Sequence, residues 1–126
     1  MKLILFTKTI EHPACRQLVN ALDRMTVPFQ VITGRQALRD VMLKMRTDEA
    51  LFIFLLMNQE DMEILNVMRP LIQDRKIITI LPDDTEHSHA IGCSVLPRFQ
   101  ALLSDDLSMV AEVAARIIGI DGDAGQ

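Results

Sequence analysis

The stretch Ala50-Leu-Phe-Ile-Phe-Leu-Leu-Met57 decides the fold, because it is the longest apolar run in the chain. It holds eight residues, whereas a membrane-spanning helix needs about 20. An apolar run of this length without alternation is typical of a strand that is buried on both faces of a parallel sheet. We therefore expect a central strand over Leu51–Leu56.

Four further short apolar runs lie on either side of this central stretch. They are rich in Ile, Val and Phe, the residues that favour strands, and turn residues bound most of them. These runs are Lys2–Phe6, Phe29–Thr33, Lys76–Leu81 and Arg98–Leu103. The sequence therefore predicts five strands in all.

Helical patterns separate these runs. Apolar residues recur with the i, i+3, i+4 spacing of a helix that packs on a sheet, starting from Ala14, Leu38, Met62 and Leu107. The segment Asp84–Leu96 is less regular, since it contains Gly92 and two histidines. We expect a short or irregular helix there.

Strand–helix alternation of this kind predicts an α/β protein with a parallel sheet covered on both faces. The expected architecture is a three-layer, doubly wound, flavodoxin-like sheet of five strands in the order 2-1-3-4-5, with a swapped strand order as the main alternative. Ile4, Val31, Ile53 and Ile78 should be buried in it. Residues 1–118 should form one domain, and residues 119–126 a flexible tail or the stub of a linker.

Composition excludes several classes of protein. The 126 residues are 49% hydrophobic and 24% charged, which excludes a disordered chain. A net charge of −4 argues against nucleic-acid binding, which needs clustered Lys and Arg. Neither a signal peptide nor a membrane span is expected. Two cysteines make no disulfide framework, so we expect reduced thiols and a cytoplasmic location.

Ligands of doubly wound sheets bind outside the carboxyl ends of the strands. The loops that follow the five predicted strands carry most of the polar side chains suited to contact a ligand. The candidate ligand-binding residues are Thr7, Lys8, Thr9, His12, Asn58, Asp83 and Ser104.

The length and strand–helix rhythm of residues 1–118 resemble a response-regulator receiver domain, although the residues of receiver chemistry are absent. Receivers carry an acidic pair after the first strand, where this chain has Thr7-Lys8-Thr9. They carry the phosphoacceptor Asp after the third strand, where this chain has Met57-Asn58. They carry Thr or Ser and then Lys after the last two strands, where this chain has Leu81-Pro82 and Leu102–Ser104.

The resemblance implies a pseudo-receiver, a non-catalytic module for signalling and protein interaction that holds no cofactor and no metal. It also implies pairing with a protein partner or a second copy through the fourth helix, fifth strand and fifth helix. Met109 and Val113 extend the apolar surface of the last helix sideways, which favours such a contact. Alternatively, both residues pack against the segment Asp84–Leu96.

A different class of function remains open: a small-molecule binding protein, for an anion, nucleotide or flavin, or a minor enzyme. Thr7-Lys8-Thr9 looks like the hydroxyl-rich phosphate loop of flavodoxins, and Lys8, His12 and Asn58 would contact the ligand. However, no Gly follows this loop, the chain has no Tyr or Trp to stack on a flavin ring, and no glycine-rich nucleotide motif is present.

Further candidates for chemistry have structural alternatives. Cys15 lies near a helix start, where a thiol can be nucleophilic, although a small buried helix residue is the simpler interpretation. His89 and Cys93 can share one helical face, whereas His87 cannot join them, and the spacing matches no zinc signature. The pairs Asp83-Asp84 and Asp105-Asp106 suit either Mg²⁺ or turns and helix caps.

Overall fold

The central strand of the sheet is β3 (Ala50–Leu55), and all of its residues are buried. The computed structural model describes residues 1–122, with the side chains of residues 1–119. Within this range the other strands are β1 (Lys2–Phe6), β2 (Gln30–Ile32), β4 (Lys76–Leu81) and β5 (Phe99–Leu102). The helices are α1 (Pro13–Arg24), α2 (Arg35–Lys44), α3 (Gln59–Ile72), α4 (Glu86–Ser94) and α5 (Ser108–Gly122).

The strand order β2-β1-β3-β4-β5 confirms the predicted doubly wound, flavodoxin-like sheet. All four strand pairs among the described residues are parallel. In the central pair Leu5 lies beside Ile53, and on the other side of β3 Ile53 lies beside Ile78. The swapped order considered above is therefore wrong.

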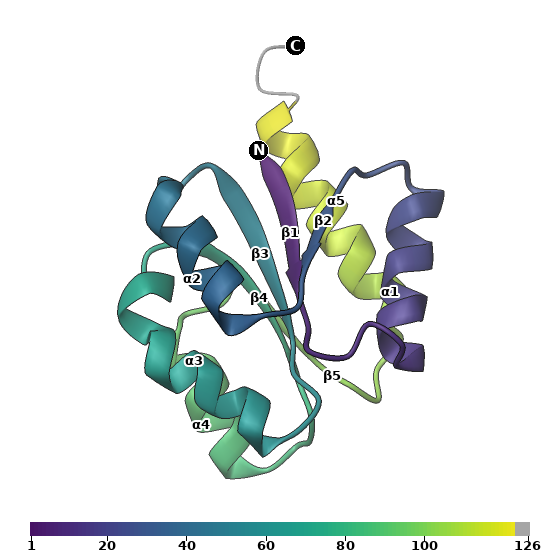
Figure 1. Cartoon of the computed structure of the whole chain (residues 1–126). Helices are drawn as coiled ribbons and strands as arrows, with labels where there is room; N and C mark the ends of the chain where they lie inside the picture. The colour runs from purple at the N-terminus through teal and green to yellow at the C-terminus, as the bar shows by residue number, and fades with distance from the viewer. Residues whose placement is uncertain (123–126) are drawn as a thin grey trace.

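Two apolar cores lie on opposite faces of the sheet. One contains the buried residues of α2, α3 and α4, and the other contains those of α1 and α5 (Figure 1). Alternate residues of β3 feed the two cores, with Phe52 and Phe54 on the first face and Ile53 on the second. No helix within residues 1–122 has both the length and the apolar character needed to span a membrane.

The predicted burial holds for Ile4, Ile53 and Ile78 but is wrong for Val31, which is 37% exposed. Val31 lies in β2, a strand of three residues at the edge of the sheet. The helices α1 and α2 on either side of this edge leave its side chain partly open. Val31 was expected to be buried because it lies in an apolar run. An edge strand, however, has a neighbouring strand on one side only, so its side chains are covered less than those of a central strand.

The short or irregular helix expected within Asp84–Leu96 is α4, a short helix that is regular. In it the Thr85 hydroxyl accepts a hydrogen bond from the backbone N–H of Ser88 at 3.2 Å. This cap offsets the low helix propensity of Gly92. The last helix continues to Gly122, beyond the predicted domain end at residue 118, and residues 123–126 of the predicted tail lie outside the described residues.

Arg75 joins α2, α3 and the sheet at the end opposite the carboxyl ends of the strands. Its guanidinium donates hydrogen bonds to the backbone carbonyls of Leu71 at 2.7 Å, Met45 at 3.2 Å and Met42 at 2.5 Å. It also lies 5.9 Å from the centre of the Phe52 ring. The last carbonyls of a helix have no partner within the helix, so one side chain here satisfies the ends of two helices.

We expect Arg75→Met to lower the free energy of unfolding by about 2 kcal/mol, because it removes several charge-assisted hydrogen bonds in one change. Urea unfolding would measure the loss. Arg46→Met is the matched control, since Arg46 makes only exposed ion pairs with Asp48 and Glu49, which are worth less than about 1 kcal/mol. Equal losses for the two variants would contradict the role given to Arg75.

Candidate functional site

The candidate residues all lie where the sequence places them, in loops after the carboxyl ends of the strands. Thr7 follows β1 and is buried, and its hydroxyl oxygen accepts a hydrogen bond from the backbone N–H of Thr9 at 3.2 Å. His12 begins α1, and its Nδ1 accepts from the N–H of Ala14 at 3.0 Å. Lys8 is exposed. The side chains of Thr7 and His12 therefore stabilise the loop and the start of α1.

Asn58 lies just beyond the carboxyl end of β3, as predicted, and caps α3. Its side-chain oxygen accepts a hydrogen bond from the N–H of Asp61 at 2.9 Å. The carboxylate of Asp61 is buried and accepts in return from the N–H of Met57 at 2.9 Å. Asp61 was not among the residues predicted at this end of the sheet. The signal was present in the sequence, because an acidic residue three positions after a helix-capping residue is typical of such a reciprocal cap.

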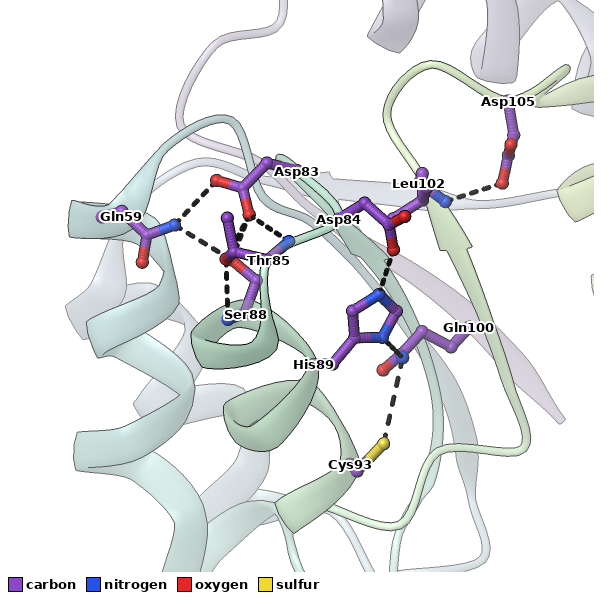
Figure 2. Close-up of polar contacts among 10 residues, drawn as sticks. All are labelled: Gln59, Asp83, Asp84, Thr85, Ser88, His89, Cys93, Gln100, Leu102 and Asp105. Atoms are coloured by element: carbon purple, nitrogen blue, oxygen red, sulfur yellow. Dashed lines mark hydrogen bonds and ion pairs between the residues drawn. The ribbon is translucent and has the colours of Figure 1, made fainter.

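Asp83 collects the most hydrogen bonds at this edge (Figure 2). One carboxylate oxygen accepts from the N–H and hydroxyl of Thr85, at 3.1 and 2.7 Å, and from the hydroxyl of Ser88 at 2.7 Å. The other accepts from the side-chain amide of Gln59 at 2.9 Å. Bonds from the Thr85 hydroxyl, then from Ser88 and the Thr85 N–H, lower the pKa of Asp83 to about 2.

The acidic pair after β5 has the same local role. Asp105 accepts a hydrogen bond from the N–H of Leu102 at 2.8 Å, which folds the loop back on its strand (Figure 2). Asp106 accepts from the N–H and hydroxyl of Ser108 and from the amide of Gln17 at 3.0 Å. The Ser108 hydroxyl lowers the pKa of Asp106 below its usual value. Ser104, the predicted ligand contact, is exposed beside this pair.

A second polar network crosses from α4 to β5. His89 Nε2 lies 2.5 Å from a carboxylate oxygen of Asp84, and its Nδ1 lies 3.2 Å from the side-chain nitrogen of Gln100 (Figure 2). The oxygen of Gln100 accepts from the buried hydroxyl of Thr79 at 3.0 Å, and its nitrogen lies 3.9 Å from the Cys93 sulfur. This geometry allows Nε2 to donate a hydrogen bond to Asp84 and Nδ1 to accept one from Gln100.

Gly92 lets this network form. A Cβ atom at Gly92 would lie 2.5 Å from the side-chain oxygen of Gln100 and 2.9 Å from a methyl group of Leu81. Any larger residue at this position would therefore push α4 or Gln100 away. His89 and Cys93 share one helix face as predicted, and His87 is exposed outside their network. The sequence did not predict a role for Gln100, because only the pairing of β5 with β4 brings this residue to α4.

Most of the carboxylates at this edge cap helices or hold turns. No group of three or more His, Cys, Asp or Glu side chains placed to hold a metal ion occurs in the described part of the chain. The carboxylates of Asp61, Asp83, Asp105 and Asp106 already hold backbone or side-chain donors. Of the positions that match the receiver pattern, Thr7 and Asn58 carry side chains that hold local structure, Leu81 is apolar, and Lys8 and Ser104 are exposed.

Comparison of the chain with protein-family models, with curated proteins and with solved structures found no match.

We expect the hydrogen bonds of Asp83 to make stability depend on pH. Its pKa is about 2 in the folded state and about 4 in an unfolded chain. The carboxylate therefore stabilises the folded protein above about pH 4, and this contribution is lost as the pH falls to about 2. Asp83→Asn should be less stable than the wild type at neutral pH, with the difference closing over that range.

Urea unfolding at a series of pH values would measure this difference. Asp23→Asn is the control, because the Asp23 side chain has no hydrogen-bond or ion-pair partner in residues 1–119. A difference between wild type and Asp83→Asn that stayed constant from neutral pH to pH 2 would refute the role of the carboxylate charge.

Proposed function

We propose that the domain is a non-catalytic, receiver-like module that acts in signalling by binding a protein partner or a second copy of itself. The parallel order β2-β1-β3-β4-β5 supports the architecture, and the side chains of the strand ends support the absence of phosphotransfer. Both cysteines are free thiols, Cys15 buried and Cys93 exposed. Free thiols fit a cytoplasmic location, which we include in the proposal.

The observation that carries the proposal is the engagement of the carboxylates. Phosphotransfer to an aspartate needs a carboxylate oxygen that is free to attack the phosphorus of the donor, with a metal ion beside it to neutralise the charge of the transferred group. Asp83 instead accepts four hydrogen bonds, and Asn58, the residue after Met57 at the end of β3, is an amide that caps α3. An amide cannot form an acyl phosphate, and Lys8 adds positive charge where a metal would bind.

Incubation with Mg²⁺ and a small phosphodonor such as acetyl phosphate tests this directly. We expect no acyl phosphate, measured as a mass increase that hydroxylamine removes. A true receiver domain treated in parallel is the positive control. An acyl phosphate mapped by peptide mass spectrometry to Asp83, Asp84 or any other loop aspartate would overturn the proposal.

The surface proposed for pairing lies on α5. This helix packs beside α1, and α4 lies on the opposite face of the sheet (Figure 1). The alternative in which Met109 and Val113 pack against α4 therefore does not apply. Val113 packs on the core that α1 and α5 share, whereas Met109 remains 42% exposed. An apolar side chain left open on this helix supports a contact with another molecule.

We expect sedimentation at micromolar concentrations to show a monomer–dimer equilibrium that Met109→Glu shifts to monomer, because a charge would be buried in the contact. The contact should bury at least about 1,000 Å² in total. Val67→Glu is the matched control: Val67 is 63% exposed on α3, on the opposite face. A wild type that sediments as a monomer, or equal effects of the two variants, would remove pairing through α5.

A further inference from the structure

A cavity of about 400 Å³ lies between α1 and the edge strand β2. Volumes of about 300–1,000 Å³ are typical of sites for small molecules. One wall comes from two adjacent turns of α1, and the other comes from alternate positions of β2 and the residue after it. Ile10, in the loop after β1, closes one end. The lining residues are Ile10, Cys15, Arg16, Val19, Asn20, Val31 and Thr33.

The floor of this cavity is apolar. Val31 and Ile10 line it, and both are large apolar residues left open, at 37% and 52% exposure. Cys15 and Val19 form the base of the α1 wall and pack on the core beneath. The strand pattern predicts that Val31 is buried, but its side chain is exposed and faces this cavity. A bound apolar group would cover the side chain that no helix covers.

The rim is polar and uncommitted. The side chains of Arg16, Asn20 and Thr33 make no hydrogen bond or ion pair with any residue that the structure describes. This is the reverse of the strand-end edge, where Asp83 and Asn58 are fully engaged with neighbouring groups. Free polar groups around an apolar floor are the arrangement that orients a ligand in a binding site.

We propose that this cavity binds a small amphipathic monocarboxylate, with its apolar chain on Ile10 and Val31 and its carboxylate on Arg16. A guanidinium forms paired hydrogen bonds with a carboxylate, and Asn20 and Thr33 add neutral donors. Arg16 is the one cation that lines the cavity, and the protein carries a net charge of −4. A single negative charge is therefore matched here, whereas a phosphate dianion would leave a charge without a counterpart.

The site lies beside the crevice predicted from the strand ends but does not include Lys8, Asn58 or Asp83. The proposal goes beyond the interaction module, since pairing through α5 does not depend on it. A second cavity, of about 310 Å³ between α2 and α3, is lined by Arg35 and Arg39 and by the exposed Val67. Arg39 therefore serves as a control, because it is an arginine beside exposed apolar surface in another part of the molecule.

Titration calorimetry with octanoate and with octanol tests the proposal. We expect saturable binding of octanoate by the wild type and weaker binding of octanol, which has the same chain without the charge. Arg16→Gln should weaken octanoate binding about tenfold or more, the loss expected for one charge-assisted pair, and leave octanol unchanged. Val31→Phe should reduce the binding of both by filling the cavity. Arg39→Gln should have no effect.

The two cysteines give a second readout that depends on location. Cys15 lines the cavity and Cys93 lies on α4, on the other face of the sheet. The buried Cys15 should react with a small thiol reagent more slowly than the exposed Cys93. Octanoate should slow the reaction of Cys15 further and leave that of Cys93 unchanged, as followed by mass spectrometry. Absence of octanoate binding, equal affinity for octanol, an unchanged affinity in Arg16→Gln, or equal protection of both cysteines would overturn the proposal.

Discussion

The burial of β3 on both faces is the constraint on which the rest of the structure depends. Its residues Ala50–Leu55 are all buried, and its backbone pairs with β1 on one side and β4 on the other. Each fully buried Leu, Ile or Phe contributes about 1.5–3 kcal/mol relative to exposure, so this strand requires a helical layer on each face. The two layers in turn fix the point at which every loop leaves the sheet.

The polar residues at the strand ends are a consequence of that geometry. Each strand that ends in the core is followed by a loop that leads to a helix on one face of the sheet. The first N–H groups of that helix need hydrogen-bond acceptors. Asn58, Thr85 and His12 supply them directly, while Asp83 holds the turn before α4. The edge at which this kind of fold commonly binds ligands is thus occupied by the connections themselves, and the uncommitted polar groups lie farther out, at Arg16 and its neighbours.

The sequence was sufficient for what depends on local pattern. The continuous apolar run identified β3, and the strand–helix rhythm predicted the strand order that the structure confirms. It was insufficient where a residue depends on partners far along the chain. Val31 is apolar like Phe29 and Ile32, but the pattern does not show how much of an edge strand the helices cover. Gln100 reaches His89 only because β5 pairs with β4. The packing of α4 likewise depends on distant residues, because Gly92 permits close contact with Gln100 and Leu81 although it lowers helix propensity.

The order of the strands also has a consequence for the nascent chain. The run from Ala50 to Leu56 is uncharged, rich in strand-forming residues and free of proline, the composition of segments that aggregate when they are exposed. Its first neighbour, β1, is already synthesised when β3 emerges, but its second neighbour, β4, begins only at Lys76. During that interval one side of the most apolar strand has no partner, so translation through α3 is the period in which this protein is most open to aggregation or to capture by a chaperone. Once both β4 and β5 are in place, the exposed edges of the sheet are β2 and β5, which have three and four residues and offer little length on which another chain can pair.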